Sequence, residues 1–291
     1  MKRRDVLKNI SLGAGALAVS NINTFAQSTL DTNTPFSLKG NINHSVCRWC
    51  FSKTPLEELA EKSADMGIKA IDLLKPEEWA IVSKYGLKCS LGTDTFANIK
   101  HGFNAVKNHK PLQEQYSGLI DKAADAGVKQ VIVFSGNRFG MDDEIGLENC
   151  AVGLDPLIKQ AEKRGVTVIM ELLNSKVNHK DYMCDNSPWG IKLVDKIGSE
   201  NFKLLYDIYH MQVMEGDIIA TIRQNANYYG HYHTAGVPGR NEIGDTQELY
   251  YPAIMKAIVE TGFKGYVAQE FIPVSEDKLA ALRQAIQICD V

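Results

Sequence analysis

The sequence has few cysteines, and their spacing argues against two common uses of this residue. Its 291 residues contain six cysteines, which is too few for a small fold held together by disulfide bonds. Cys47 and Cys50 stand two residues apart, as in zinc and redox pairs, but the chain has no second such pair. A structural zinc site is therefore not predicted. We interpret these two cysteines as packing residues, and the pattern leaves a disulfide between them open.

The sequence also lacks a surplus of charge of one sign and long apolar runs. Its formal net charge is -3, with 23% charged and 44% hydrophobic residues. Nucleic-acid-binding proteins usually carry a basic surplus or a basic stripe, so a nucleic-acid partner is not expected. After residue 40 no apolar run approaches the roughly 20 residues that a membrane-spanning helix needs. The mature chain is therefore expected to bind neither nucleic acid nor membrane.

The N-terminus has the layout of a bacterial export signal. A basic group at residues 2–4 precedes a weakly apolar stretch at 10–22, and a cleavage site with small residues ends at Ala26. The adjacent arginines are typical of the twin-arginine type. This order predicts a signal peptide at 1–26, a linker at 27–40 and a periplasmic location. The alternative is a disordered basic tail followed by a short amphipathic helix.

From residue 41 to residue 291 the chain repeats an apolar run, a polar loop and an amphipathic helix that ends near glycine. Glycine tolerates the left-handed backbone that a helix C-terminal cap needs, and four glycines fit this role: Gly67, Gly127, Gly165 and Gly262. The apolar runs predict eight strands, at about 42–47, 68–74, 88–93, 129–135, 166–172, 202–208, 228–234 and 266–271.

Eight strand–helix units of about 30 residues each predict a single α/β domain with the (β/α)8 TIM-barrel fold. Runs such as 131–134 are apolar nearly throughout, as expected for parallel strands that are buried on both faces. The main alternative is a doubly wound open sheet. That fold would need a glycine-rich phosphate turn after its first strand, and none follows residues 42–47.

Four consecutive predicted strands end on an ionisable residue. These residues are Glu171, Asp207, His233 and Glu270. Reactive groups of such barrels lie at the C-terminal ends of the strands, where buried carboxylates need an opposite charge. Three carboxylates and one imidazole offer mostly oxygen ligands, which suits one divalent ion such as Mn2+, Mg2+ or Co2+. Taken singly, each residue could equally be a hydrogen-bonded polar group at the barrel end.

Other polar residues follow the same strand ends and are candidates to bind the substrate. His210 stands three residues after Asp207, and His179 lies on the loop after the fifth strand. After the seventh strand, Arg240 could bind a carboxylate or phosphate. The remaining candidates are Glu242 on the same loop and Trp49 after the first strand. His231, two residues before His233, is either a packing residue or a support for His233.

These residues resemble a known family. The strand-end set, together with the Asp207-x-x-His210 and Pro238-Gly239-Arg240-x-Glu242 motifs, is similar to the xylose-isomerase-like barrels, and within them to the hydroxypyruvate isomerase group and the D-tagatose 3-epimerase type. The resemblance implies a metal-dependent isomerase of a small sugar or keto acid. It also implies that Glu171 and Glu270 are the acid/base pair that moves a proton through an enediolate. In one respect the sequence departs from the hydroxypyruvate isomerase pattern, which tends to have glutamine where His233 stands, whereas the epimerase pattern has histidine.

Several activities share this scaffold, and the sequence leaves most of them open. A ketose 3-epimerase or an inosose-type dehydratase would use the same proton abstraction, and a non-catalytic sugar-binding barrel would keep only the fold. An apurinic endonuclease would need more histidines and carboxylates and a basic face, which are not evident. The sequence therefore predicts an enzyme with a small-molecule substrate, and it does not indicate the oligomeric state.

Overall fold

The computed structural model describes residues 37–291, so the predicted signal peptide and most of the linker lie outside the described residues. The strands are β1 (Asn43–Cys47), β2 (Ala70–Asp72), β3 (Lys88–Cys89), β4 (Gln130–Val133), β5 (Thr167–Glu171), β6 (Phe202–Asp207), β7 (Tyr229–Thr234) and β8 (Tyr266–Gln269). The helices are α1 (Leu56–Asp65), α2 (Pro76–Ser83), α3 (His109–Ala126), α4 (Asp143–Arg164), α5 (Ser187–Ile197), α6 (Ile208–Met214), α7 (Ile218–Gln224), α8 (Tyr251–Glu260) and α9 (Lys278–Cys289).

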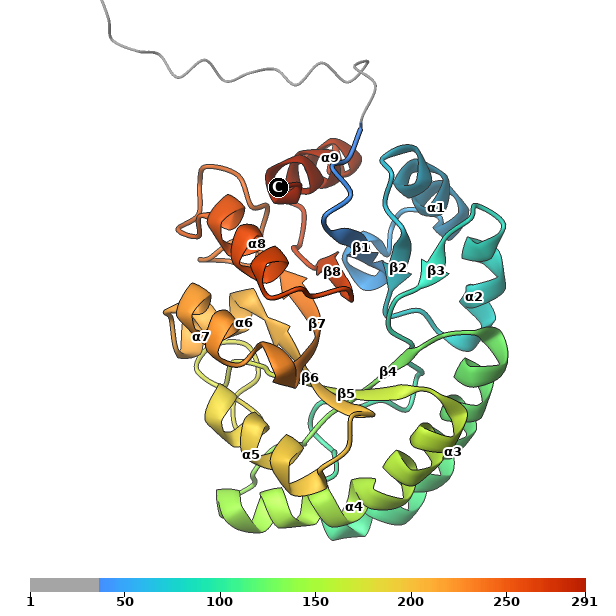
Figure 1. Cartoon of the computed structure of the whole chain (residues 1–291), viewed down its shortest axis with the longest axis vertical. Coiled ribbons are helices and arrows are strands. Elements are labelled where there is room, and N and C mark those ends of the chain that lie inside the picture. Colours follow the sequence, from blue (N-terminus) through green and yellow to red (C-terminus); the bar gives the residue numbers. More distant parts are fainter. Residues whose placement is uncertain (1–36) are drawn as a thin grey trace, which may run out of the picture. The chain divides into compact units, whose positions relative to one another are not determined.

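The eight strands form one parallel sheet in the order β3-β2-β1-β8-β7-β6-β5-β4. The two outer strands meet through Gly92, whose N–H donates to Gln130 O at 2.8 Å and whose carbonyl accepts from Ile132 N at 3.0 Å. The helices surround the strands (Figure 1). The predicted (β/α)8 barrel is therefore confirmed, and each predicted strand contains an observed one.

The helix ends explain how the chain turns back into the sheet. Gly67, Gly127, Gly165 and Gly262 all have positive φ angles, of 77°, 75°, 64° and 79°, as the left-handed cap position requires. The N-cap residue of α1 is Pro55, and no side-chain hydrogen bond caps this helix.

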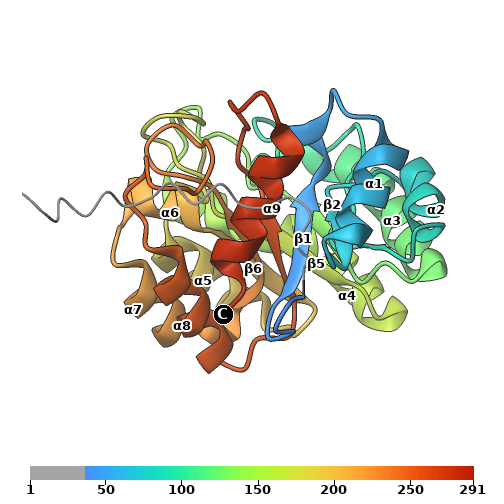
Figure 2. The same ribbon diagram turned by 90° about the horizontal axis from the view of Figure 1, so that it is seen from above.

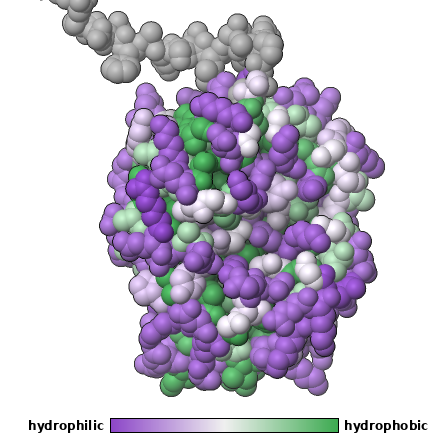
Figure 3. Space-filling model, in the orientation of Figure 1, coloured by the Kyte–Doolittle hydropathy of each residue, from purple (hydrophilic) through white to green (hydrophobic). Residues whose placement is uncertain are grey.

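The core consists of apolar strand and helix residues that are shielded on both faces of the sheet. Val131, Ile132 and Val133 of β4 are at most 1% exposed, as parallel strands covered by helices should be. The face shown in Figure 3 is largely hydrophilic, with small hydrophobic areas between polar ones. Among residues 37–291, no helix is long and apolar enough to cross a membrane.

All six cysteines are buried and have free thiols. Cys47 ends β1, and Cys50 lies in the short 3-10 helix Arg48–Phe51 that follows. The structure therefore contains no disulfide between them, and both side chains are buried in the core.

The two ends of the barrel have different loops. The loops that leave the C-terminal ends of β5 and β7 lie at the same edge of the domain as the turn after β1 (Figure 2). At the opposite end, where β1 begins, His44 lies with its Nε2 at 3.7 Å from the Asp290 carboxylate beyond α9. The functional groups predicted from the strand ends thus share the edge with the long loops.

His44 should make the stability of the fold depend on pH. Burial lowers the pKa of His44 to about 4, although Asp290 acts in the opposite direction. The unfolded chain binds this proton from about pH 6.5 downward and the folded chain does not, so folding loses up to roughly 3 kcal/mol between pH 6.5 and 4.

We therefore expect the difference in unfolding free energy between wild type and the variant His44→Gln to change by this amount over that range. Urea unfolding followed by circular dichroism at several pH values measures it. The variant His101→Gln, at an exposed position, is the control and should run parallel to wild type. If the unfolding free energies of wild type and His44→Gln changed in parallel with pH, the prediction would be contradicted.

Candidate metal centre and active site

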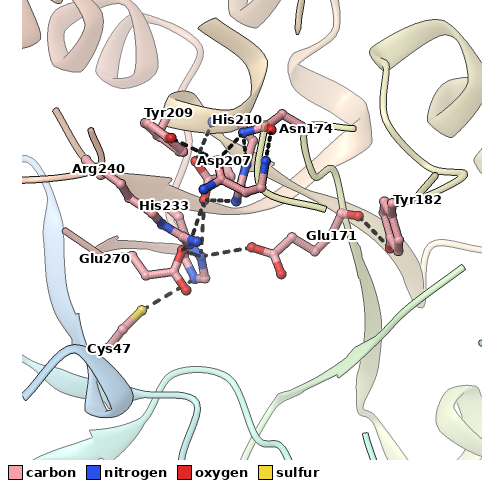
Figure 4. Close-up of polar contacts among 12 residues, drawn as sticks. Cys47, Glu171, Asn174, Tyr182, Asp207, Tyr209, His210, His233, Arg240 and Glu270 are labelled. Carbon is pink, nitrogen blue, oxygen red and sulfur yellow. Dashed lines mark hydrogen bonds and ion pairs between the residues drawn. The ribbon is translucent and has the colours of Figure 1, made fainter. Parts of the chain in front are cut away.

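Four buried side chains from the last four strands converge at the C-terminal end of the barrel (Figure 4). They are Glu171 at the end of β5, Asp207 at the end of β6, His233 in β7 and Glu270 directly after β8. Their ligand atoms all lie within 4.8 Å of one another. The structure thus brings together the four residues that the sequence proposed as metal ligands.

The imidazole of His233 stands between two sets of carboxylates. Its Nδ1 lies 2.8 Å from Glu270 Oε2, 3.3 Å from Glu171 Oε1 and 4.0 Å from Asp207 Oδ2. Its Nε2 lies 2.8 Å from Asp72 Oδ2. Since a carboxylate only accepts hydrogen bonds, each nitrogen needs either a proton or a cation between itself and these oxygens.

Two oxygens of this cluster are buried without a hydrogen-bond donor among the described residues. They are Glu171 Oε1 and Asp207 Oδ2. The other oxygen of Asp207, Oδ1, accepts from His210 N at 3.0 Å, because Asp207 caps the N-terminus of α6. A buried carboxylate oxygen without a donor is unfavourable unless a cation compensates it. One imidazole nitrogen and three carboxylates fit a divalent ion such as Mn2+, Mg2+ or Co2+.

The three carboxylates of the cluster have different electrostatic surroundings, which shift their pKa values in different directions. Burial raises the pKa of Asp207 well above its ordinary value, and Glu270 adds to this effect. Burial also raises the pKa of Glu171. Burial acts in the same direction on Glu270, but Arg240 and His233 hold its pKa well below the ordinary value. The site therefore holds Glu270 ionised and disfavours charge on the other two in the absence of a cation.

Arg240 lies within the carboxylate cluster. Its Nη2 donates to Glu270 Oε2 at 2.5 Å and lies 3.6 Å from Asp207 Oδ2. The guanidinium also lies over the rings of Trp49 and Tyr209, at 5.1 and 5.6 Å from their centroids. A positive φ of 62° at Arg240 accompanies this placement. The residue proposed to bind substrate thus already neutralises one of the predicted ligands.

Trp49 is the other neighbour of Glu270. Its Nε1 donates to Glu270 Oε1 at 2.8 Å, so both oxygens of this glutamate have donors. The ring is 39% exposed and forms part of a cavity of about 430 Å3, which Phe134 and Thr93 also line. Trp49 therefore lies at the position proposed for it, in the wall of a space large enough for a small molecule.

His210 is buried beside the cluster, and one of its nitrogens has no hydrogen-bond partner. Its Nδ1 accepts from Asn174 Nδ2 at 2.6 Å. The side-chain oxygen of Asn174, Oδ1, accepts hydrogen bonds from two backbone N–H groups, so this orientation of the side-chain amide is fixed. The neutral ring then carries its proton on Nε2, which lies 3.7 Å from Asp207 Oδ2 and donates to no described residue. The His179 ring lies 5.2 Å away, in the wall of a second cavity of about 470 Å3.

Glu242 is placed differently from the other predicted residues. Its Oε1 accepts from the backbone N–H groups of Val274 and Ser275, both at 2.8 Å. It is not among the residues whose ligand atoms converge. In this structure Glu242 supports the loop after β8 and makes no contact with the four-ligand cluster.

The sequence reasoning missed Asp72, the buried carboxylate next to His233. It ends the apolar run of β2 in the same way that Glu171 ends β5, so the strand-end rule could have found it. His231 lies next to it, with its Nε2 at 3.2 Å from Asp72 Oδ1.

Comparisons with known proteins agree with this architecture. A sequence model of the family described as "Xylose isomerase-like TIM barrel" matches residues 56–289. Hydroxypyruvate isomerase of Escherichia coli is 33% identical over 142 residues, which cover 43% of this chain and 55% of the relative. A 2-oxo-tetronate isomerase of Pectobacterium atrosepticum is 24% identical over 236 residues, covering 77% of this chain and 88% of the relative.

A likeness to solved structures supports the fold alone. The crystal structure of D-psicose 3-epimerase with D-tagatose from Clostridium cellulolyticum H10 superposes with a TM-score of 0.71 at 16% sequence identity. The superposition covers 86% of this chain and 100% of that one.

The cluster predicts a measurable metal affinity. We expect the protein to bind one equivalent of Mn2+ in isothermal titration calorimetry. The variant Asp207→Asn should bind at least about 10-fold more weakly, because an amide replaces a charged ligand. The variant Asp155→Asn, at an exposed position of α4 paired with Lys159, is the matched control and should bind like wild type. Equal affinity in Asp207→Asn would mean that the ion is bound elsewhere.

Proposed function

The chain belongs to the xylose isomerase-like TIM barrel family, and from this premise we propose that it is a metal-dependent isomerase of a small hydroxy-carbonyl compound, of hydroxypyruvate isomerase type. The observation that carries the proposal is that two glutamates, Glu171 and Glu270, lie beside the same imidazole nitrogen. Their oxygens lie 3.3 and 2.8 Å from His233 Nδ1. The names of the relatives, hydroxypyruvate isomerase and 2-oxo-tetronate isomerase, support an isomerase.

The four converging residues would hold the ion, and their chemistry fits it. A divalent ion bound there polarises a carbonyl oxygen and makes the neighbouring C–H more acidic. The proton transfer itself is assigned to protein carboxylates, which are the only buried bases in the cluster besides His233.

The two glutamates differ in their partners and therefore in their roles. Both oxygens of Glu270 accept hydrogen bonds, Oε1 from Trp49 and Oε2 from Arg240, which keeps this side chain ionised and fixed in orientation. Glu171 Oε1 has no donor among the described residues, so a proton on Glu171 displaces fewer hydrogen bonds than a proton on Glu270 would. Glu270 starts as the base and Glu171 carries the proton in the complementary step.

The remaining polar groups would orient the substrate. His210 offers the proton on Nε2 to a substrate oxygen, since Asn174 holds the other nitrogen as an acceptor. His179 and Trp49 line the two cavities beside the cluster.

A ketose 3-epimerase is the second candidate. Both reactions remove a proton from the carbon beside a carbonyl, and they differ in where the proton returns. His233 favours this alternative, because the resemblance associates a histidine at this position with the epimerases and a glutamine with hydroxypyruvate isomerases. The product formed decides between the two.

Proton abstraction can be tested by nuclear magnetic resonance in heavy water. The mature protein, loaded with Mn2+, is incubated with ketoses, hydroxypyruvate and inososes, and the metal is removed before spectra are recorded. We expect deuterium at the carbon next to the carbonyl, with a rate reduced at least about 100-fold in Glu270→Gln, because the base is lost. The matched control is Glu260→Gln, at an exposed residue paired with Arg223.

The products distinguish the candidates. A new carbonyl position identifies an isomerase, inversion at the carbon an epimerase, and loss of water a dehydratase. A folded, metal-loaded protein that exchanges no deuterium with any of these compounds contradicts the proposed function and favours a sugar-binding barrel.

We further propose that the protein is exported to the periplasm through its N-terminal segment. The support is the order of basic residues, apolar stretch and cleavage site in residues 1–26. In cell fractionation, wild type should appear in the periplasm with Gln27 as its first residue. Replacement of Arg3 and Arg4 by lysine should leave the full-length chain in the cytoplasm, and Lys2→Arg is the control. Wild type that keeps Met1 and stays in the cytoplasm would disprove export.

A further inference from the structure

A layer of buried polar side chains lies on the other side of the His233 ring from Glu171, Asp207 and Glu270. Its centre is Asp72 at the end of β2, whose Oδ2 lies 2.8 Å from His233 Nε2. β2 and β7 are separated by β1 and β8 in the sheet, so this contact crosses the interior of the barrel. Both side chains are 0% exposed, and a lost partner could not be replaced by bulk water.

Asp72 is itself fixed from three strands. Ser90, just after β3, donates its hydroxyl to Oδ1 at 2.5 Å, and His231 of β7 has its Nε2 at 3.2 Å from the same oxygen. Cys47 of β1 donates its thiol to Oδ2 at 3.4 Å. The carboxylate therefore cannot rotate without breaking contacts on both of its oxygens.

His231 is held in turn from the wall of the barrel. Its Nδ1 lies 2.9 Å from Gln130 Oε1, and the amide nitrogen of Gln130 donates to Gly230 O at 2.8 Å. That second bond fixes which end of the amide faces His231. The side chains of Gln130, His231, Asp72 and His233 thus form a row of close polar contacts from β4 to the four converging residues, in which His231 Nε2 approaches Asp72 without a hydrogen bond.

This arrangement determines which nitrogen of His233 can bind a metal. A carboxylate has no hydrogen to donate, so the Nε2 that faces Asp72 carries the proton. When a cation occupies the other side, the ring would be neutral with its lone pair on Nδ1, which faces Glu171, Asp207 and Glu270. Outer partners of this kind fix the tautomer and the ring orientation of histidine ligands, and their loss typically weakens metal binding 10- to 100-fold.

We propose that Asp72 is a positioning residue for the metal centre, which holds His233 with Nε2 protonated so that Nδ1 is the ligand atom. The proposal rests on the metal site of the proposed function. Asp72 itself would contact neither the ion nor the substrate. The polar side chains around Asp72 would keep the His233 imidazole in one orientation.

Two measurements test this role without turnover. The first is the affinity for Mn2+ by isothermal titration calorimetry, which should fall 10- to 100-fold in Asp72→Ala. The second is the Nε2 proton of His233 in long-range 15N–1H spectra of histidine-labelled protein, with and without Zn2+. We expect a low-field signal that is absent in His233→Gln and that shifts or disappears in Asp72→Ala. Should Asp72→Ala fail to fold, Asp72→Leu fills the space and still removes the acceptor.

Ser90→Ala is the matched control. Ser90 contacts Asp72 but does not contact His233, so this variant should keep the Nε2 signal and lose less than about threefold in affinity, the loss of one neutral partner. An unchanged Mn2+ affinity together with a wild-type Nε2 signal in Asp72→Ala and Asp72→Leu overturns the proposal. Two equivalents of Zn2+ in wild type and one in Asp72→Ala also overturn it, because Asp72 would then be a ligand.

The outcomes separate this proposal from the proposed function. Absence of deuterium exchange contradicts the isomerase and leaves the role of Asp72 to be decided by affinity and tautomer. If wild type binds no metal, the metal site fails, and the spectra of the metal-free protein still show whether Asp72 holds the Nε2 proton.

Discussion

The main constraint on this site is the repulsion between four carboxylates that are buried around one imidazole. Glu171, Asp207 and Glu270 face one side of His233 and Asp72 faces the other. Charges of this kind are stable in a protein interior only when they are paired or when they coordinate a cation. His233 and Arg240 supply part of the compensation, but two oxygens keep no donor among the described residues. One more positive charge beside these two oxygens would therefore stabilise the cluster.

The barrel makes this concentration of charge possible because each strand delivers one side chain to the same end. Closure through Gly92 brings β2 opposite β7, so that Asp72 and His233 meet across the interior although 161 residues separate them. Strands such as β4 and β5 are largely apolar and buried, and the hydrophobic effect of that core stabilises the fold that holds the charges in place. The destabilising cluster is tolerated at a site where the scaffold is rigid.

Much of this arrangement could be predicted from the sequence, since it follows from periodicity. Apolar runs and glycine caps such as Gly127 gave the strands and helices, and the position of Glu171, Asp207 and Glu270 at strand ends gave the cluster. The contacts that loop residues make could not be predicted. The loop of Arg240 folds back so that this residue reaches Glu270. Glu242 accepts hydrogen bonds from the backbone of the loop after β8. Such choices depend on loop conformation, which has no periodic signal.

The same scaffold makes two chemically identical side chains unequal. Glu270 accepts hydrogen bonds from Trp49 and Arg240, whereas no described side chain donates to Glu171 Oε1, which lies 3.3 Å from His233 Nδ1. Their pKa values are shifted in opposite directions, downward for Glu270 and upward for Glu171. A pair of acids separated in this way can hold one proton on one member while the other stays ionised, which is the condition for moving a proton between two positions of a substrate. Because the donors to Glu270 come from the loops after β1 and β7, the difference between the glutamates is a property of those loops and not of the strands that carry them.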